Sequence, residues 1–239
     1  MEWTDHAVVL SARKHGENAA IVTLLTEEHG RHAGLIRGAM GKRARGLIQP
    51  GNRVIATWRA RIADHLGTFS CELMRASSAL LLDDPLRLAG LSAACAMAAT
   101  ALPEREPHRQ LYDGLVAFLE ALPGEDWPSL YVRWELDLLR ELGFGLDLSS
   151  CAATGRNDQL AYVSPKSGQA VSLAAGEPYR RALLPLPPFL LTGRLAESQA
   201  EIANGLTLAE YFLEHHVFAE GRQKIPPARR RLAERFSNL

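Results

Sequence analysis

The chain has 239 residues, of which 47% are hydrophobic and 23% charged, and its mean hydropathy is −0.09. Nineteen Gly, 13 Pro and three Cys exclude collagen-like, disordered and disulfide-rich classes. No apolar run reaches the roughly 20 residues of a membrane helix, and the first residues lack the apolar stretch of a signal peptide. We therefore expect a cytoplasmic protein with reduced cysteines and no membrane partner.

The net charge is zero, because 27 basic residues face 27 acidic ones, and the sequence pI is about 7.1. This balance argues against a nucleic-acid partner, but it hides a division along the chain. Residues 1–75 carry 11 basic and 7 acidic groups, residues 76–150 carry 5 and 12, and residues 151–239 carry 11 and 8. The change of sign near residue 76 indicates a domain boundary there.

The first 76 residues favour β structure, because short β-branched and apolar runs alternate with Gly, Pro and Asn turn signals. Such runs cover five ranges: 6–11, 19–26, 32–38, 53–61 and 68–73. Five short strands in so few residues predict a small closed barrel or sandwich, and we expect a first domain over 1–76.

From residue 77 the apolar period changes to that of helices, which predicts a second, helical domain over 77–239. Asp83-Asp84-Pro85 is a helix start, and Pro123-Gly124 ends a second helix. Further helices are predicted from Asp126 to Gly143 and over 206–218 and 229–236. Residues 148–179, which are punctuated by Gly, Ser, Asn and Pro, are predicted to form an irregular lobe, so the fold class is α+β.

The segment from Arg31 to Ala63 holds eight basic residues and no Asp or Glu. Seven of the eight are Arg, whose planar guanidinium suits phosphate and stacks on bases. Residues 38–46 are predicted to be a flexible basic loop that could follow a phosphate backbone. The alternative is a solvated strand edge whose charges discourage strand pairing. The candidate nucleic-acid-binding residues are Arg31, Arg37, Lys42, Arg43, Arg45, Arg53, Arg59 and Arg61.

Motifs for catalysis are missing. Gly41-Lys42 is not a phosphate-binding P-loop, because Ile36 stands at the required glycine position and Arg43 at the required Ser or Thr. No G-x-S-x-G or paired-carboxylate motif occurs. We therefore expect no enzyme activity and no cofactor, although an uncharacterised enzyme using the helical domain stays open.

Cys151 begins a pattern with the spacing of a four-cysteine zinc ribbon, C-x2-C-x17-C-x2-C. Thr154, Ser172 and Ala175 stand at the other three ligand positions. One thiolate cannot hold structural zinc, which needs four donors. We therefore expect no metal site in the lobe.

Arg133 and Arg140, seven residues apart, fall on one face of the helix predicted after Asp126. The spacing favours pairing within the helix, for example with Asp137. A docking point for an acidic peptide is the alternative.

The order of these features, and four segments in particular, resemble the RecO family of bacterial DNA repair and recombination mediator proteins. The segments are residues 21–31 (IVTLLTEEHGR), 47–51 (LIQPG), 131–144 (YVRWELDLLRELGF) and 161–168 (AYVSPKSG). They follow one another in the family's order, and the helix that ends in Leu-Gly-Phe is the most specific of them.

The resemblance implies an N-terminal OB-fold and a non-catalytic role in recombinational repair. The family binds single- and double-stranded DNA, anneals complementary strands and helps to load the RecA recombinase onto strands coated by single-stranded-DNA-binding protein. The implied partners are RecR and the acidic C-terminal tail of the coating protein, and the implied location is cytoplasmic and nucleoid-associated. It assigns DNA contact to the basic barrel residues and the acidic tail to Arg133, with Arg140 beside it. An RNA-binding OB protein is the alternative.

Overall fold

The computed structural model describes residues 1–62, 64–219 and 224–237. It divides into two compact units, Met1–Gly124 with Pro226–Arg229, and Glu125–Ile225 with Arg230–Leu239. The described strands and helices confirm the predicted α+β class. The domain boundary predicted at residue 76 stays a prediction.

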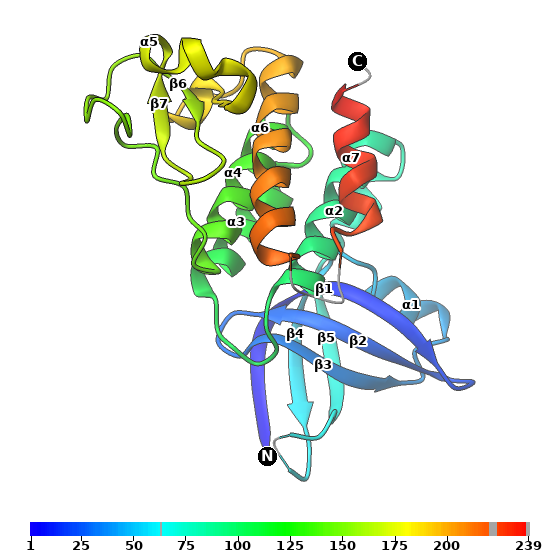
Figure 1. The fold of residues 1–239 in the computed structure, drawn as a ribbon. Helices are drawn as coiled ribbons and strands as arrows, with labels where there is room; N and C mark the ends of the chain where they lie inside the picture. Colours follow the sequence, from blue (N-terminus) through cyan, green and yellow to red (C-terminus); the bar gives the residue numbers. More distant parts are fainter. Residues whose placement is uncertain (63, 220–223, 238–239) are drawn as a thin grey trace. The chain divides into compact units, whose positions relative to one another are not determined.

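Five strands form a closed barrel in the order β1-β2-β3-β5-β4. They are β1 (Glu2–His15), β2 (Ala19–Thr26), β3 (Gly30–Arg37), β4 (Arg53–Arg59) and β5 (Thr68–Arg75). The long β1 pairs with β4 through its first half and with β2 through its second, with an irregularity between Val9 and Ser11, which lets one strand serve two neighbours (Figure 1).

The barrel core consists of inward-facing residues that alternate with outward-facing ones along each strand. Val22, Val54 and Trp58 are almost completely buried in it. Only glycine fits at position 34 on β3, because a Cβ on Gly34 would lie 2.4 Å from the ring of Phe69 on β5. This close approach lets the Phe69 ring pack across the barrel.

Between β3 and β4 the chain forms a short helix, α1 (Lys42–Leu47), where a flexible loop was predicted. The prediction was wrong because it weighed the glycines at 38, 41 and 46 and not the contacts of the apolar positions. Leu47 packs against the barrel core, and Ile48, which follows, is buried in it. These contacts order a segment whose local sequence is a poor helix former.

The first unit also contains η1 (Ser78–Leu81), α2 (Pro85–Ala101) and α3 (Arg109–Ala121). The predicted start of α2 is confirmed, because the carboxylate of Asp84 accepts hydrogen bonds from the backbone N–H groups of Leu86 and Arg87, both at 3.0 Å. The thiol of Cys95 on α2 donates to the carbonyl of Val9 on β1 at 3.7 Å, so α2 packs on the barrel.

The second unit is helical, with a small sheet in its lobe. Its elements are α4 (Trp127–Glu141), β6 (Leu160–Val163), β7 (Ala170–Ser172), α5 (Leu173–Gly176), η2 (Glu177–Ala182), β8 (Leu184–Pro185), η3 (Pro188–Leu190), α6 (Gln199–Phe212) and η4 (Leu213–Val217), and α7 (Pro227–Ser237) follows. The sheet order is β7-β6-β8. Helices α4 and α6 approach closely at Gly205, where a Cβ would lie 2.8 Å from Val132. Among the described residues no helix is long and apolar enough to cross a membrane.

Candidate nucleic-acid interface

Two of the eight candidate residues, both arginines, hold other segments against the barrel. The guanidinium of Arg31 donates to the carbonyl of Leu102 at 2.6 Å and lies 3.4 Å from Glu104. Arg53 pairs with Glu120 on α3 at 2.5 Å. Their side chains are only 19% and 21% exposed, so both arginines are structural within the first unit.

Arg59 and Arg61 lie at the end of β4 and just after it, and both are exposed. Arg59 pairs with Glu2 on β1 at 2.8 Å, and this contact lowers the pKa of the Glu2 carboxyl and raises that of the guanidinium. Such an exposed pair contributes little to stability and opens readily. Within the described residues Arg61 has no ion pair.

The remaining four residues gather where β3 ends and α1 begins. Arg37 is the last residue of β3, and Lys42, Arg43 and Arg45 lie on α1. All four are exposed, and none makes an ion pair within the part of the chain that the structure describes. Below, Arg37, Lys42, Arg43 and Arg45 are called the α1 cluster.

Backbone hydrogen bonds fix the turn that leads from β3 into α1 and so position the α1 cluster. Gly38 has φ +69°, and the N–H of Gly41 donates to its carbonyl at 3.2 Å, so the chain turns sharply out of β3. The N–H of Ala39 donates to the carbonyl of Asn18 at 3.1 Å, which fixes this turn to the β1–β2 connection. The cluster therefore combines free positive charge with a defined position on the barrel.

A second candidate site lies on α4, in the other unit. Arg133 and Arg140 line a cavity of about 330 Å³ whose walls include Leu136, Leu148 and Leu190. Arg140 is 59% exposed and pairs with Asp137 at 2.9 Å, as the spacing favoured. Burial raises the pKa of the Asp137 carboxyl, against the opposing effect of Arg140. The cavity thus combines leucine walls with a rim on which the carboxylate of Asp137 lies beside the two arginines.

Arg133 differs from Arg140 in its partners. Its guanidinium donates to the carbonyl of Phe189 at 2.8 Å and also to that of Arg194. It lies 5.8 Å from the centre of the Phe189 ring. Arg133 therefore fixes the segment that follows β8, which forms one wall of the cavity.

The zinc-ribbon positions of the lobe do not fit a zinc ion. Cys151 is buried, its thiol donates to the Ser172 hydroxyl at 3.5 Å, and it accepts from the Ser172 N–H at 3.2 Å. When the sulfur is ionised it can accept hydrogen bonds from the Ser172 hydroxyl and from Thr154, and these contacts lower the pKa of the thiol to about 6. One thiol among hydroxyls lacks the four nitrogen or sulfur donors of structural zinc. Within the described residues no three His, Cys, Asp or Glu side chains gather as a metal site.

Sequence reasoning missed a group of residues next to the α1 cluster. Leu35, Thr68, Phe69 and Cys71 line a cavity beside Arg37, although their sequence signal is only the alternation of ordinary strands. The cavity forms because β3 and β5, far apart in sequence, meet at a single residue pair. No local pattern encodes this meeting.

A closed five-stranded barrel of this order, with a helix after β3 and a helical region after β5, defines an OB-fold protein of the α+β class. Residues 1–76 match the family model described as "Recombination protein O N terminal", and residues 82–224 match "Recombination protein O C terminal". The chain belongs to the RecO family.

Curated relatives match almost the whole chain. The "DNA repair protein RecO" of Rhodospirillum centenum is 58% identical over 238 residues, covering 99% of this chain and 95% of the relative. The protein of the same name from Phenylobacterium zucineum is 51% identical, with 99% and 98% covered. That from Rhodospirillum rubrum is 50% identical, with 99% and 96% covered.

Proposed function

We propose that this chain is a non-catalytic DNA-repair protein that binds single- and double-stranded DNA and anneals complementary strands. In this proposal it also assists the loading of RecA onto strands coated by single-stranded-DNA-binding protein, with RecR as a partner. Full-length similarity to proteins named DNA repair protein RecO supports the repair role. The α1 cluster carries the DNA contact, because its four exposed cations have no acidic partner among the described residues and together form a phosphate-binding surface on a small barrel.

Charge reversal on α1 tests this proposal. Arg43→Glu combined with Arg45→Glu removes two phosphate contacts and adds two repulsive charges. We expect the Kd for single-stranded DNA to rise roughly tenfold or more at 100 mM salt, and strand annealing to slow in parallel. Fluorescence anisotropy with a labelled oligonucleotide measures binding, and the appearance of labelled duplex measures annealing.

Arg180→Glu combined with Arg181→Glu is the matched control. Both residues are exposed on η2, and the change in net charge is the same. This variant is expected to bind DNA as the wild type does. Equal effects of the two double variants would show that the binding follows overall charge, and tighter binding of RNA than of DNA would favour an RNA-binding role.

We further propose that the α4 cavity receives the acidic C-terminal tail of single-stranded-DNA-binding protein. A peptide carboxylate would replace Asp137 beside Arg140, and an apolar side chain would enter among Leu136, Leu148 and Leu190. In this proposal Arg133 shapes the wall through the carbonyls it holds. The arginines of the rim and the leucine walls together support this occupant.

A labelled tail peptide tests this docking. Arg140→Ala is expected to raise the peptide Kd about tenfold, because a charge-assisted hydrogen bond is lost. Arg180→Ala is the matched control, since Arg180 also pairs three residues away with an acidic residue, Glu177 at 3.6 Å. Peptide affinity that is unchanged in Arg140→Ala would remove this rim from the binding site.

A further inference from the structure

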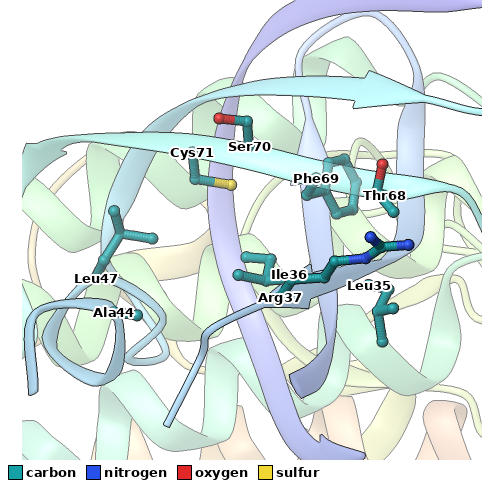
Figure 2. Close-up of a pocket in the computed structure, with 9 residues that line it drawn as sticks. All are labelled: Leu35, Ile36, Arg37, Ala44, Leu47, Thr68, Phe69, Ser70 and Cys71. Atoms are coloured by element: carbon teal, nitrogen blue, oxygen red, sulfur yellow. The ribbon is translucent and has the colours of Figure 1, made fainter. Parts of the chain in front are cut away.

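The barrel has an opening beside the α1 cluster, between β3 and β5. It is a cavity of about 490 Å³, with Leu35 and Arg37 from β3, Phe69 and Cys71 from β5 and Ala44 from α1 among its walls. Figure 2 shows Ala44 and Leu47 at one end of this cavity and the Arg37 guanidinium, Thr68 and Leu35 toward the other. Below, this cavity is called the β3–β5 slot.

The slot exists because the barrel closes at one point only. In the described chain β3 and β5 pair at Leu35 and Thr68, where the Leu35 N–H donates to the carbonyl of Gly67 at 3.1 Å. Along a strand, the backbone groups of every second residue point to the same side. Arg37 follows Leu35 by two residues and Cys71 follows Gly67 by four, so the backbone groups of Arg37 and Cys71 also turn toward the slot. Beyond the single pair the two strand edges therefore offer hydrogen-bonding groups to a ligand.

The walls of the slot combine apolar surface with polar groups. Leu35 and Leu47 offer aliphatic faces, whereas Thr68 and Ser70 carry hydroxyl groups. A nucleobase has flat apolar faces and a rim of donors and acceptors, and proteins bind unstacked bases in such surroundings. The volume also falls within the range of small-molecule pockets.

The positive charge beside the slot favours a ligand that carries a negative charge. Arg37 belongs both to the wall and to the α1 cluster, whose other members lie on the helix that supplies Ala44 and Leu47. Glu72, the acidic residue on β5, follows Ser70 on the same face of the strand but is not among the residues that line the slot. A ligand that enters the slot therefore meets positive charge at its mouth, as a nucleotide phosphate requires.

We infer that the β3–β5 slot receives an unpaired base of single-stranded DNA while the adjacent phosphates lie on the α1 cluster. This inference rests on the proposed DNA binding and adds a base-binding site to it. A base within a duplex has its pairing edge occupied and its faces stacked, so it does not enter. The slot thus gives the barrel a means to prefer single strands, which charge alone does not supply.

A cycle of two protein variants and two ligands tests the inference. Ala44→Leu places bulk in the slot, whereas Gly46→Leu adds the same side chain on the same helix where a Cβ meets no atom within 4 Å. The ligands are an oligothymidylate of about 12 nucleotides and an equally long abasic chain, which keeps the phosphates and lacks the bases. Wild-type protein and Gly46→Leu are expected to bind the oligothymidylate about tenfold tighter than the abasic chain.

In Ala44→Leu this ratio is expected to fall toward one, with the affinity for the abasic chain unchanged. An unchanged ratio in a folded Ala44→Leu variant overturns the slot inference and leaves the proposed DNA binding intact. The proposed DNA binding itself fails if Arg43→Glu with Arg45→Glu leaves the abasic affinity unchanged. The two failures are therefore distinguishable.

A second position guards against misfolding of the first variant. Ser70 lines the slot and is exposed, so Ser70→Phe fills the mouth without disturbing the core. The melting temperatures of all variants are compared. If Ala44→Leu melts at a lower temperature than the wild type, the affinity ratio of Ser70→Phe is used to decide the test. A ratio near one supports the inference and a wild-type ratio overturns it.

Discussion

His32 occupies an unusual position inside the barrel. Its side chain is 4% exposed and packs edge-on against the rings of Trp3, Trp58 and Phe69, with ring centroids 4.9 to 6.1 Å away. Neither ring nitrogen has a hydrogen-bond partner among the described residues. Burial, with smaller effects of Arg105 and His29, lowers the pKa of His32 to about 4. The imidazole is therefore neutral in the folded protein at pH 7.

This burial predicts a specific loss of stability in mild acid. The unfolded chain protonates His32 near pH 6.5 and the folded chain only near 4, so stability falls as the pH drops through that interval. Between pH 7 and pH 5 His32 is expected to remove about 2 kcal/mol from the free energy of unfolding. Urea unfolding at both pH values measures the loss.

His32→Phe keeps an aromatic ring in the cluster and removes the titration, so its stability is expected to fall less between the two pH values. His15→Gln, at an exposed position of the β1–β2 hairpin, is the control and should behave as the wild type does. An identical pH dependence in His32→Phe and wild type would contradict the neutral buried imidazole.

The arginines show how far single residues can be predicted from sequence. Composition identified all eight basic residues of the 31–63 segment, because charge is a property of the residue itself. It did not separate Arg31 and Arg53, which pair with Glu104 and Glu120, from the α1 cluster. Those acidic partners lie 73 and 67 residues further along the chain, and only the fold brings them near.

At the scale of elements, prediction succeeded where local chemistry decides the structure. Asp84-Pro85 predicted the start of α2, because a capping carboxylate and a first-turn proline act within four residues. It failed at α1, where burial of Leu47 and Ile48 outweighs the glycines. The β3–β5 slot could not be predicted either, since it depends on which strands meet in the fold and not on local sequence.

The lobe has the sequence spacing of a zinc ribbon, and its structure shows which contacts join the ligand positions. Its spacing is that of a zinc ribbon, and its folded form places Ser172 against Cys151, two positions that metal would otherwise join. Hydrogen bonds between Cys151 and Ser172 thus connect the beginning of the lobe to the end of β7. The absence of zinc stays a prediction, which the donor set supports.

At the scale of the whole molecule, a pI of about 7.1 describes neither the basic nor the acidic segments of the chain. The acidic residues of the 76–150 segment balance the sum, but within the described part of the chain no member of the α1 cluster makes an ion pair. Screening at physiological salt acts over about 8 Å, so a ligand responds to the charges near it and not to the total. A neutral protein can therefore present a strongly positive site.

The salt dependence of DNA binding tests this view of the molecule. Four phosphate contacts on a single strand predict a slope of about −3 in a plot of log affinity against log salt concentration, which is roughly a 50-fold loss between 50 and 200 mM. Arg43→Glu with Arg45→Glu is expected to halve the slope, whereas Arg180→Glu with Arg181→Glu keeps it despite an equal change in net charge. Anisotropy titrations across this salt range give the slopes. A wild-type slope near zero, or one that both double variants lower equally, would contradict a local phosphate-binding surface on α1.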